Sequence, residues 1–224
     1  MSEPLKRQVA ELARGLHAAG WVANHDGNAS ARLADGRRFL ATPTAVSKRL
    51  VDAHDVLTVD IEGKVLSGRK RLFSEWHLHA AAYRARADVG AVLHAHPPHA
   101  TTVGLARKQL GVPALPEMVV SLGANLPTIE YALPKSPAQD AALARALGDG
   151  DADAVLIAGN GVLTVGVDLE QAYLRMELVE HYARMVVAAA PLGGLGALPA
   201  DDVKKLLDAR TKAGLGKAGR AAVR

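Results

Sequence analysis

Apolar and polar residues alternate along the chain with two different periods, which predicts a mixture of helices and strands. Leu5, Val9, Leu12 and Leu16 recur three and four residues apart, so residues 5–19 are expected to form an amphipathic helix. Further helices are predicted at about residues 74–86, 99–107, 137–147 and 169–190. Short apolar runs bounded by turn formers predict strands within residues 37–42, 56–60, 64–68, 90–96, 126–132, 154–159 and 161–166. The segment 24–33, NHDGNASARL, is rich in turn formers and is expected to be a loop.

The order of these elements favours an α/β fold of the α+β type. Residues 56–60 and 64–68 flank the turn formers Glu62-Gly63 and are expected to pair antiparallel. A three-layer α/β/α sandwich around a largely antiparallel sheet fits hairpins mixed with helices better than a doubly wound parallel sheet does. We expect one domain over residues 1–210 and a basic tail over residues 211–224.

Composition narrows the class of protein. The chain is 49% hydrophobic and 22% charged, has no apolar run of membrane-spanning length and lacks a signal peptide at its start, so we expect a cytoplasmic globular protein. It has no cysteine, so any metal must be held by histidine, carboxylate, amide or water. Much of the net charge of +4 lies near the C-terminus without aromatic residues, which does not favour nucleic-acid binding.

The segment VLHAHPPHATT carries the candidate chemistry. On a strand, residues two apart face the same way, so His94 and His96 can converge on one metal ion. Ser74 can cap the following helix, and Glu75 at the helix start is a natural carboxylate neighbour for both rings. His99 is a weaker candidate, which supports a metal ligand, lines the pocket wall or has a structural role. Packing or helix-surface roles are expected for His77 and His79. Taken alone, the paired histidines are also consistent with ordinary buried or surface residues.

Four segments, in this order and spacing, resemble the class II aldolase and adducin head family. They are GNASAR (27–32), ATPT (41–44), SEWHLHAAAYRARADVGAVLHAHPP (74–98) and AVLIAGNGVLTVG (154–166). The resemblance covers roughly residues 5–210. It implies the three-layer sandwich, a homotetramer with active sites at subunit interfaces, and a divalent metal, commonly zinc, held by three histidines beside a glutamate.

The resemblance assigns His94 and His96 to the metal and Glu75 to the catalytic glutamate. The third histidine is absent, because the chain reads Gly159-Asn160-Gly161 where the family has His-Gly. Asn160 either binds the ion, directly or through water, or the ion shifts toward Glu75 or His99, or metal binding is lost. An amide oxygen is a harder ligand than imidazole, so manganese, cobalt or magnesium are alternatives to zinc.

The resemblance also assigns Asn28, Thr44 and Ser74 to the substrate phosphate. Phe73 replaces the first of two serines and Ala45 replaces a glycine, which weakens the case for a phosphorylated substrate. A smaller, carboxylated or aromatic substrate is the alternative. The alternatives to substrate contact are a role as a turn residue for Asn28 and core packing for Phe73.

Glu117 falls where relatives carry an acid or base contributed across the subunit interface; a surface salt bridge is its alternative role. The expected activity is that of a carbon–carbon lyase, an aldolase that cleaves or forms a bond through a metal-stabilised enediolate of a small hydroxy-carbonyl substrate. A decarboxylase, dehydratase or epimerase of the same family is the alternative, as is a non-catalytic interaction module like the adducin head.

Overall fold

The computed structural model describes residues 3–133 and 135–222 and contains one eight-stranded sheet in that part of the chain. The strand order is β4-β3-β2-β1-β5-β8-β7-β6, and every neighbouring pair is antiparallel except β6 with β7. The strands are β1 (Asn28–Arg32), β2 (Arg38–Ala41), β3 (Leu57–Asp60), β4 (Val65–Ser67), β5 (Ala91–Ala95), β6 (Thr128–Ile129), β7 (Ala154–Ile157) and β8 (Val162–Gly166). The predicted strand at 126–132 is thus reduced to two residues.

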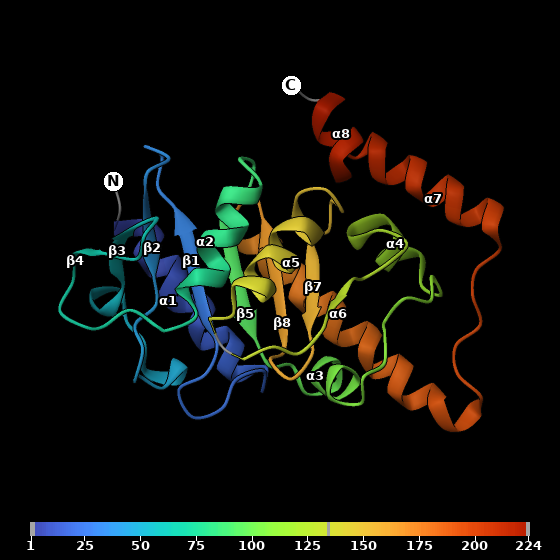
Figure 1. Cartoon of the computed structure of the whole chain (residues 1–224), viewed down its shortest axis with the longest axis horizontal. Helices are drawn as coiled ribbons and strands as arrows, with labels where there is room; N and C mark the ends of the chain where they lie inside the picture. The colour runs from blue at the N-terminus through green and yellow to red at the C-terminus, as the bar shows by residue number, and fades with distance from the viewer. Residues whose placement is uncertain (1–2, 134, 223–224) are drawn as a thin grey trace.

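Helices cover both faces of this sheet (Figure 1). Helices α2 and α5 lie on one face, whereas α1, α3 and α6 lie on the other. The α-helices are α1 (Glu3–Ala18), α2 (Trp76–Ala85), α3 (Pro98–Leu105), α4 (Pro116–Leu122), α5 (Pro137–Leu147), α6 (Leu169–Ala189), α7 (Ala200–Lys212) and α8 (Gly216–Ala222), with short 3-10 helices at Lys48–Leu50, Ala53–Asp55 and Ala190–Leu192. The predicted three-layer α/β/α sandwich with a largely antiparallel sheet is confirmed.

The alternation of side chains along β5 decides which face receives the histidines. Leu93 packs into the core beside α1 and α6, whereas Val92 packs into the core beside α2 and α5. His94 therefore points to the face of α2, because strand side chains alternate with a period of two. The same alternation along β1 directs Ala29 to the first core and its polar neighbour Asn28 to the α2 face.

The prediction of a loop at residues 24–33 was wrong for its second half. Residues 28–32 form β1, which pairs with β2 on one side and with β5 on the other. Its composition, NASAR, lacks the β-branched and aromatic residues that mark strands. Small side chains nevertheless suit a central strand under tightly packed helices, and pairing on two sides outweighs the weak local preference.

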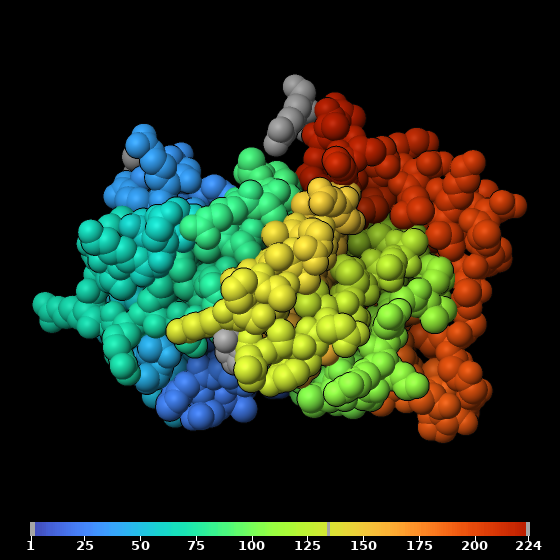
Figure 2. Space-filling model, in the orientation of Figure 1, coloured from blue at the N-terminus to red at the C-terminus, as the bar shows by residue number. Residues whose placement is uncertain are grey.

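A buried carboxylate joins the C-terminal helices to the sheet. Asp153 is fully buried and lies 2.9 Å from Arg86, 3.0 Å from Arg175 and 2.6 Å from Arg210 of α7. Arg220 of α8 pairs with Asp151 in the turn after α5 and with Asp88 in the turn after α2, so this helix packs against both turns (Figure 2). The boundary at residue 210 remains a prediction, but residues 216–222 of the expected tail are helical and attached by ion pairs.

None of the helices in the described part of the chain combines the length and the apolar character that crossing a lipid bilayer requires.

Candidate functional site

His94 forms the buried floor of the candidate site. Its side chain has no solvent exposure, and its Nδ1 lies 3.1 Å from the carbonyl oxygen of Val162 on the neighbouring strand β8. A carbonyl only accepts, so Nδ1 carries a proton in either charge state of the ring, and Nε2 offers a lone pair when the ring is neutral. Burial lowers the pKa of His94, but the carboxylate of Glu75 outweighs it and holds the pKa above its ordinary value. A metal ion at Nε2 therefore competes with a proton.

His96 lies two residues on and is oriented by a carboxylate that the sequence reasoning missed. Its Nδ1 is 3.1 Å from Oδ2 of Asp26, and the two imidazole centroids of His94 and His96 are 5.3 Å apart. Burial and the neighbouring His94 lower the pKa of His96, which favours the neutral ring. The only sequence signal for Asp26 was its place two residues before Asn28 in HDGN, which turn propensity explains equally well.

The Nε2 atoms of both imidazoles are buried and make no hydrogen bond in the described part of the chain, although Glu75 Oε1 lies 3.2 Å from Nε2 of His94. Unpaired buried nitrogens carry a desolvation cost, so such atoms call for a ligand. With Nδ1 of each ring bound to an acceptor, both Nε2 atoms are arranged as metal-binding imidazoles usually are. The donor set at His94 and His96 therefore fits a divalent metal ion.

Glu75 lies beside His94 at the start of α2. Its Oε1 is 3.2 Å from His94 Nε2 and accepts a hydrogen bond of 3.0 Å from Asn160, while its Oε2 accepts one of 2.9 Å from Asn28. Burial raises the pKa of Glu75, but the charge of His94 and these hydrogen bonds outweigh it, so the pKa lies well below its usual range. Glu75, rather than Ser74, occupies the position that precedes the helix, and no side chain caps it.

Asn160 reaches this site from the turn between β7 and β8. Gly159 and Gly161 on either side have positive φ, and a Cβ at Gly161 would lie 2.4 Å from the ring of His96, so glycine permits the close approach. Asn160 donates its amide to Glu75. Residues 3–133 and 135–222 contain no group of three histidine, cysteine, aspartate or glutamate side chains that could hold a metal, so a third protein donor at these histidines would be of another type. Metal binding by Asn160 remains a prediction.

Of the candidate substrate residues, Asn28 lies at this centre. Asn28 is buried, with its Oδ1 bound to His79 and its Nδ2 to Glu75, although Nδ2 has a second N–H to offer. The backbone N–H of Thr44 donates to the carbonyl of Arg71, which brings the 44–45 turn near the exposed Ser74. Binding of substrate by all three residues remains a prediction.

The structure shows the surroundings of Phe73 and Ala45, the two residues that replace a serine and a glycine of the family pattern. Phe73 is buried and packs against Trp76 and His79, with centroid distances of 6.0 and 4.9 Å. Ala45 has a φ of 57°, a left-handed conformation that costs a residue with a Cβ about 1–2 kcal/mol. Its methyl group therefore occupies a turn shaped for glycine.

The remaining candidate residues, Glu117, His99 and His77, lie apart from the pair His94 and His96. Glu117 is exposed in the first turn of α4, and no hydrogen bond or ion pair joins it to the histidine site within the described chain. His99 contacts Glu180, whose carboxylate also accepts from the first backbone N–H groups of α3, so this pair anchors a helix end. His77 contacts Asp140 at 2.6 Å and thereby joins α2 to α5.

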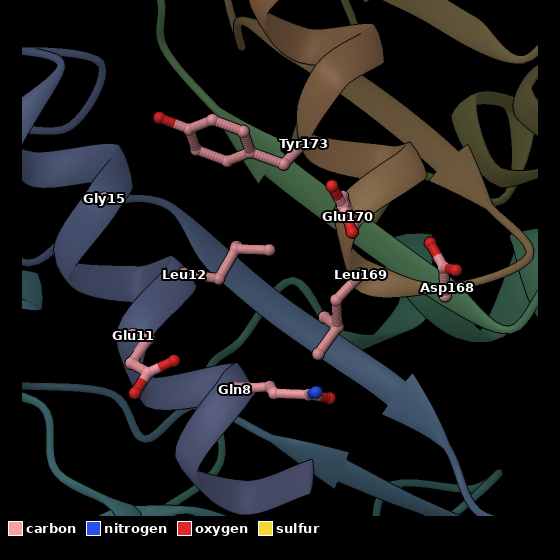
Figure 3. A pocket seen from close by; sticks show the side chains of 8 residues that line it. All are labelled: Gln8, Glu11, Leu12, Gly15, Asp168, Leu169, Glu170 and Tyr173. Atoms are coloured by element: carbon pink, nitrogen blue, oxygen red, sulfur yellow. The ribbon is translucent and has the colours of Figure 1, made fainter.

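A separate hollow lies between α1 and the start of α6 (Figure 3). This cavity of about 460 Å³ is lined by Leu12, Gly15, Leu169 and Tyr173, with three carboxylates at its edge. One of these, Asp168, caps α6 through the backbone N–H of Gln171. The cavity contains none of the predicted site residues, and the unpaired histidine nitrogens remain the stronger indication of chemistry.

Comparison with known proteins agrees with this geometry. L-fuculose phosphate aldolase of Escherichia coli K12 is 32% identical over 183 residues, which cover 81% of each chain. The 5-methylthioribulose-1-phosphate/5-deoxyribulose-1-phosphate aldolase of Rhodospirillum rubrum is 30% identical over 91% of this chain and 90% of its own. The structure of YgbL from Escherichia coli, a proposed aldolase/epimerase/decarboxylase, superposes with a TM-score of 0.84 at 26% identity, covering 92% of this chain and 99% of YgbL.

The model of the class II aldolase and adducin N-terminal domain matches residues 7–187 and so includes every residue of the histidine site. The fold and the sequence match agree, and the chain belongs to the class II aldolase and adducin N-terminal domain family.

Proposed function

We propose that the protein is a divalent-metal-dependent carbon–carbon lyase that cleaves or forms an aldol bond in a small hydroxy-carbonyl or sugar-phosphate-like substrate. The observation that carries this proposal is the pair of buried, unpartnered Nε2 atoms of His94 and His96 beside the carboxylate of Glu75. His94 and His96 would hold the ion, with Asn160 as the third protein ligand. Zinc is the first choice, with manganese, cobalt and magnesium as alternatives. When bound, the metal supplies Lewis-acid stabilisation of the negative charge that develops on the substrate oxygens.

Glu75 is the proposed base. Its low pKa keeps it ionised at neutral pH, and its 23% exposed side chain can reach a bound substrate. The amides of Asn28 and Asn160 hold one carboxylate oxygen each, so the carboxylate is held in a defined orientation before substrate binds. Glu75 would take the proton from the nucleophile carbon in bond formation and return it to that carbon in cleavage.

Glu117 is proposed to exchange the hydroxyl proton of the leaving aldehyde, taking it as a base in cleavage and returning it as an acid in bond formation. Since it is exposed and is not joined to the histidine site within the described chain, it would have to be supplied by a neighbouring copy in a homotetramer. Thr44 and Ser74 would contact the polar end of the substrate. Ala45 and Phe73 stand where the family pattern has a glycine and a serine, so a carboxylated or unphosphorylated substrate is included in the proposal.

The test compares metal content and aldol cleavage in the wild type and His94→Ala. The proteins are purified without chelator, analysed for elements and screened with phosphorylated and unphosphorylated hydroxy-carbonyl compounds. His54→Ala is the matched control, because the side chain of His54 is 78% exposed. Loss of metal and turnover in His94→Ala alone supports the proposal. A wild type that binds none of the four metals and cleaves no substrate would contradict it and favour the adducin-like interaction module.

Decarboxylation is the second candidate, since YgbL is a proposed aldolase/epimerase/decarboxylase. The same screen distinguishes the two reactions, because aldol cleavage releases an aldehyde whereas decarboxylation releases carbon dioxide.

A further inference from the structure

Helix α2 and strand β1 place five polar side chains in one interleaved row. On α2, Glu75, His79 and Tyr83 recur every four residues and so share one helix face. On β1, Asn28 and Ser30 are two residues apart and share one strand face. Four hydrogen bonds join them alternately, at 2.8 Å from Tyr83 to Ser30, 2.7 Å from Ser30 to His79, 2.6 Å from His79 to Asn28 and 2.9 Å from Asn28 to Glu75.

The hydrogen bond between Asn28 and Glu75 determines which partner is the donor in each of the other three bonds. Asn28 donates from Nδ2 to Oε2 of Glu75 and presents Oδ1 to His79. Nε2 of His79 must then donate, and Nδ1 of the neutral ring accepts from the hydroxyl of Ser30. The hydroxyl of Ser30 is thereby engaged as a donor and accepts from Tyr83. Every bond in the row donates toward Glu75, and bonds aligned in this way polarise and strengthen one another.

The surroundings of His79 keep this direction fixed. The ring has no solvent exposure and packs against both Phe73 and Trp76, with centroid distances of 4.9 and 6.0 Å. Burial lowers the pKa of His79 to about 3, so the ring is neutral and has one proton to place. Burial also raises the pKa of Tyr83, which keeps its hydroxyl protonated as a donor. Phe73, which replaces a serine of the family pattern, supplies part of the apolar surface that buries the ring of His79.

We propose that His79 is a positioning residue for the reaction, which acts through Asn28 to orient the carboxylate of Glu75. The role rests on the proposed function of Glu75 as a base. It extends the site inward from the metal-binding histidines by three side chains, His79, Ser30 and Tyr83. The sequence signature is the spacing of four on the helix combined with the spacing of two on the strand.

The test uses His79→Leu, which removes the donor to Asn28, and His79→Gln, whose amide N–H can replace Nε2–H. In His79→Leu, kcat should fall about 10- to 100-fold, below the ~10²- to 10⁴-fold that a positioned base contributes in full. KM and zinc affinity should change less than about threefold, because His94 and His96 keep their own partners. His79→Gln should recover most of kcat. Tyr83→Phe, which removes only the outermost donor, should have a smaller effect and serves if the leucine variant does not fold.

A second measurement does not depend on activity. Nitrogen-15 NMR of the wild type should show His79 as a neutral ring with the proton on Nε2, and the Asn28 side-chain amide signal should shift in folded His79→Leu. A proton on Nδ1, or a folded leucine variant with wild-type kcat, would overturn the positioning role. An inactive wild type would instead overturn the proposed function, while the NMR result would still decide the direction of the hydrogen bonds.

Discussion

Replacing Asp26 with asparagine should weaken metal binding without removing any metal ligand. In the wild type, Asp26 Oδ2 lies 3.1 Å from His96 Nδ1, while Oδ1 accepts from the backbone N–H of Ala23. Asparagine can keep the bond to Ala23 through its oxygen, but its NH2 group then faces His96. Two donors cannot pair, so the ring would move its proton from Nδ1 to Nε2 to accept this N–H. The nitrogen needed by the metal would then be protonated.

The structure sets the size of this effect. Loss of an outer carboxylate partner of a metal-binding histidine typically lowers metal affinity about 10- to 100-fold. The side chains of Asp26 and His96 are each 30% exposed, so solvent weakens their interaction and we expect the lower part of that range. A loss of about 10- to 30-fold in zinc affinity corresponds to ~1.4–2 kcal/mol.

The assay is a competition titration of metal-free protein with zinc and a coloured chelator at neutral pH. Asp35→Asn is the matched control, because Asp35 also accepts backbone N–H groups in a turn, from Arg37 and Arg38, and has no contact with the histidines. The control should bind zinc like the wild type. An Asp26→Asn variant with zinc affinity within twofold of the wild type would refute the reasoning about the proton on His96.

Two further predictions concern stability. Asp153→Asn leaves three buried arginines without their shared anion. It should lower the free energy of unfolding, measured by urea titration, by about 3–5 kcal/mol. A loss below about 1 kcal/mol would contradict this prediction. Burial raises the pKa of Asp153, but Arg175, Arg86 and Arg210 lower it overall. Its stabilisation is therefore present above the unfolded value of about 3.9 and should disappear as pH falls through the lower folded pKa. Ala45→Gly should raise the melting temperature, with ~0.5–1 kcal/mol gained by relieving the left-handed φ; an unchanged or lower melting temperature would show that the turn is not strained.

Local patterns were sufficient for many of the elements. The helix predicted at residues 137–147 coincides with α5, and the one at 169–190 differs from α6 by one residue. Here the periodicity is long and the ends carry clear signals, such as Asp168 before α6. Strand β1 was missed because its five residues have little strand propensity, and neighbours from distant segments determine its conformation.

The candidate site, too, was predictable from the sequence only in part. The spacing of His94 and His96, and Glu75 at a helix start, were sufficient to expect a metal beside a carboxylate, because those features depend on strand and helix geometry. The partners that orient them were not predictable: Asn28 and Asn160 reach Glu75 across 47 and 85 residues of sequence. Nothing local in the chain encodes which side chains meet over such separations.

By itself, then, the sequence determined the elements with long periodicity, the pair of histidines and the replacement of a third histidine by Asn160. Only the tertiary structure decided that Asp26 orients His96, that His79 lies behind Asn28, and that the C-terminal helices are attached through Asp153. The physical reason is the separation along the chain over which each kind of interaction acts. Backbone periodicity acts over a few neighbouring residues, whereas hydrogen bonds and ion pairs between buried polar groups depend on how the layers pack, and each such group must find a partner there.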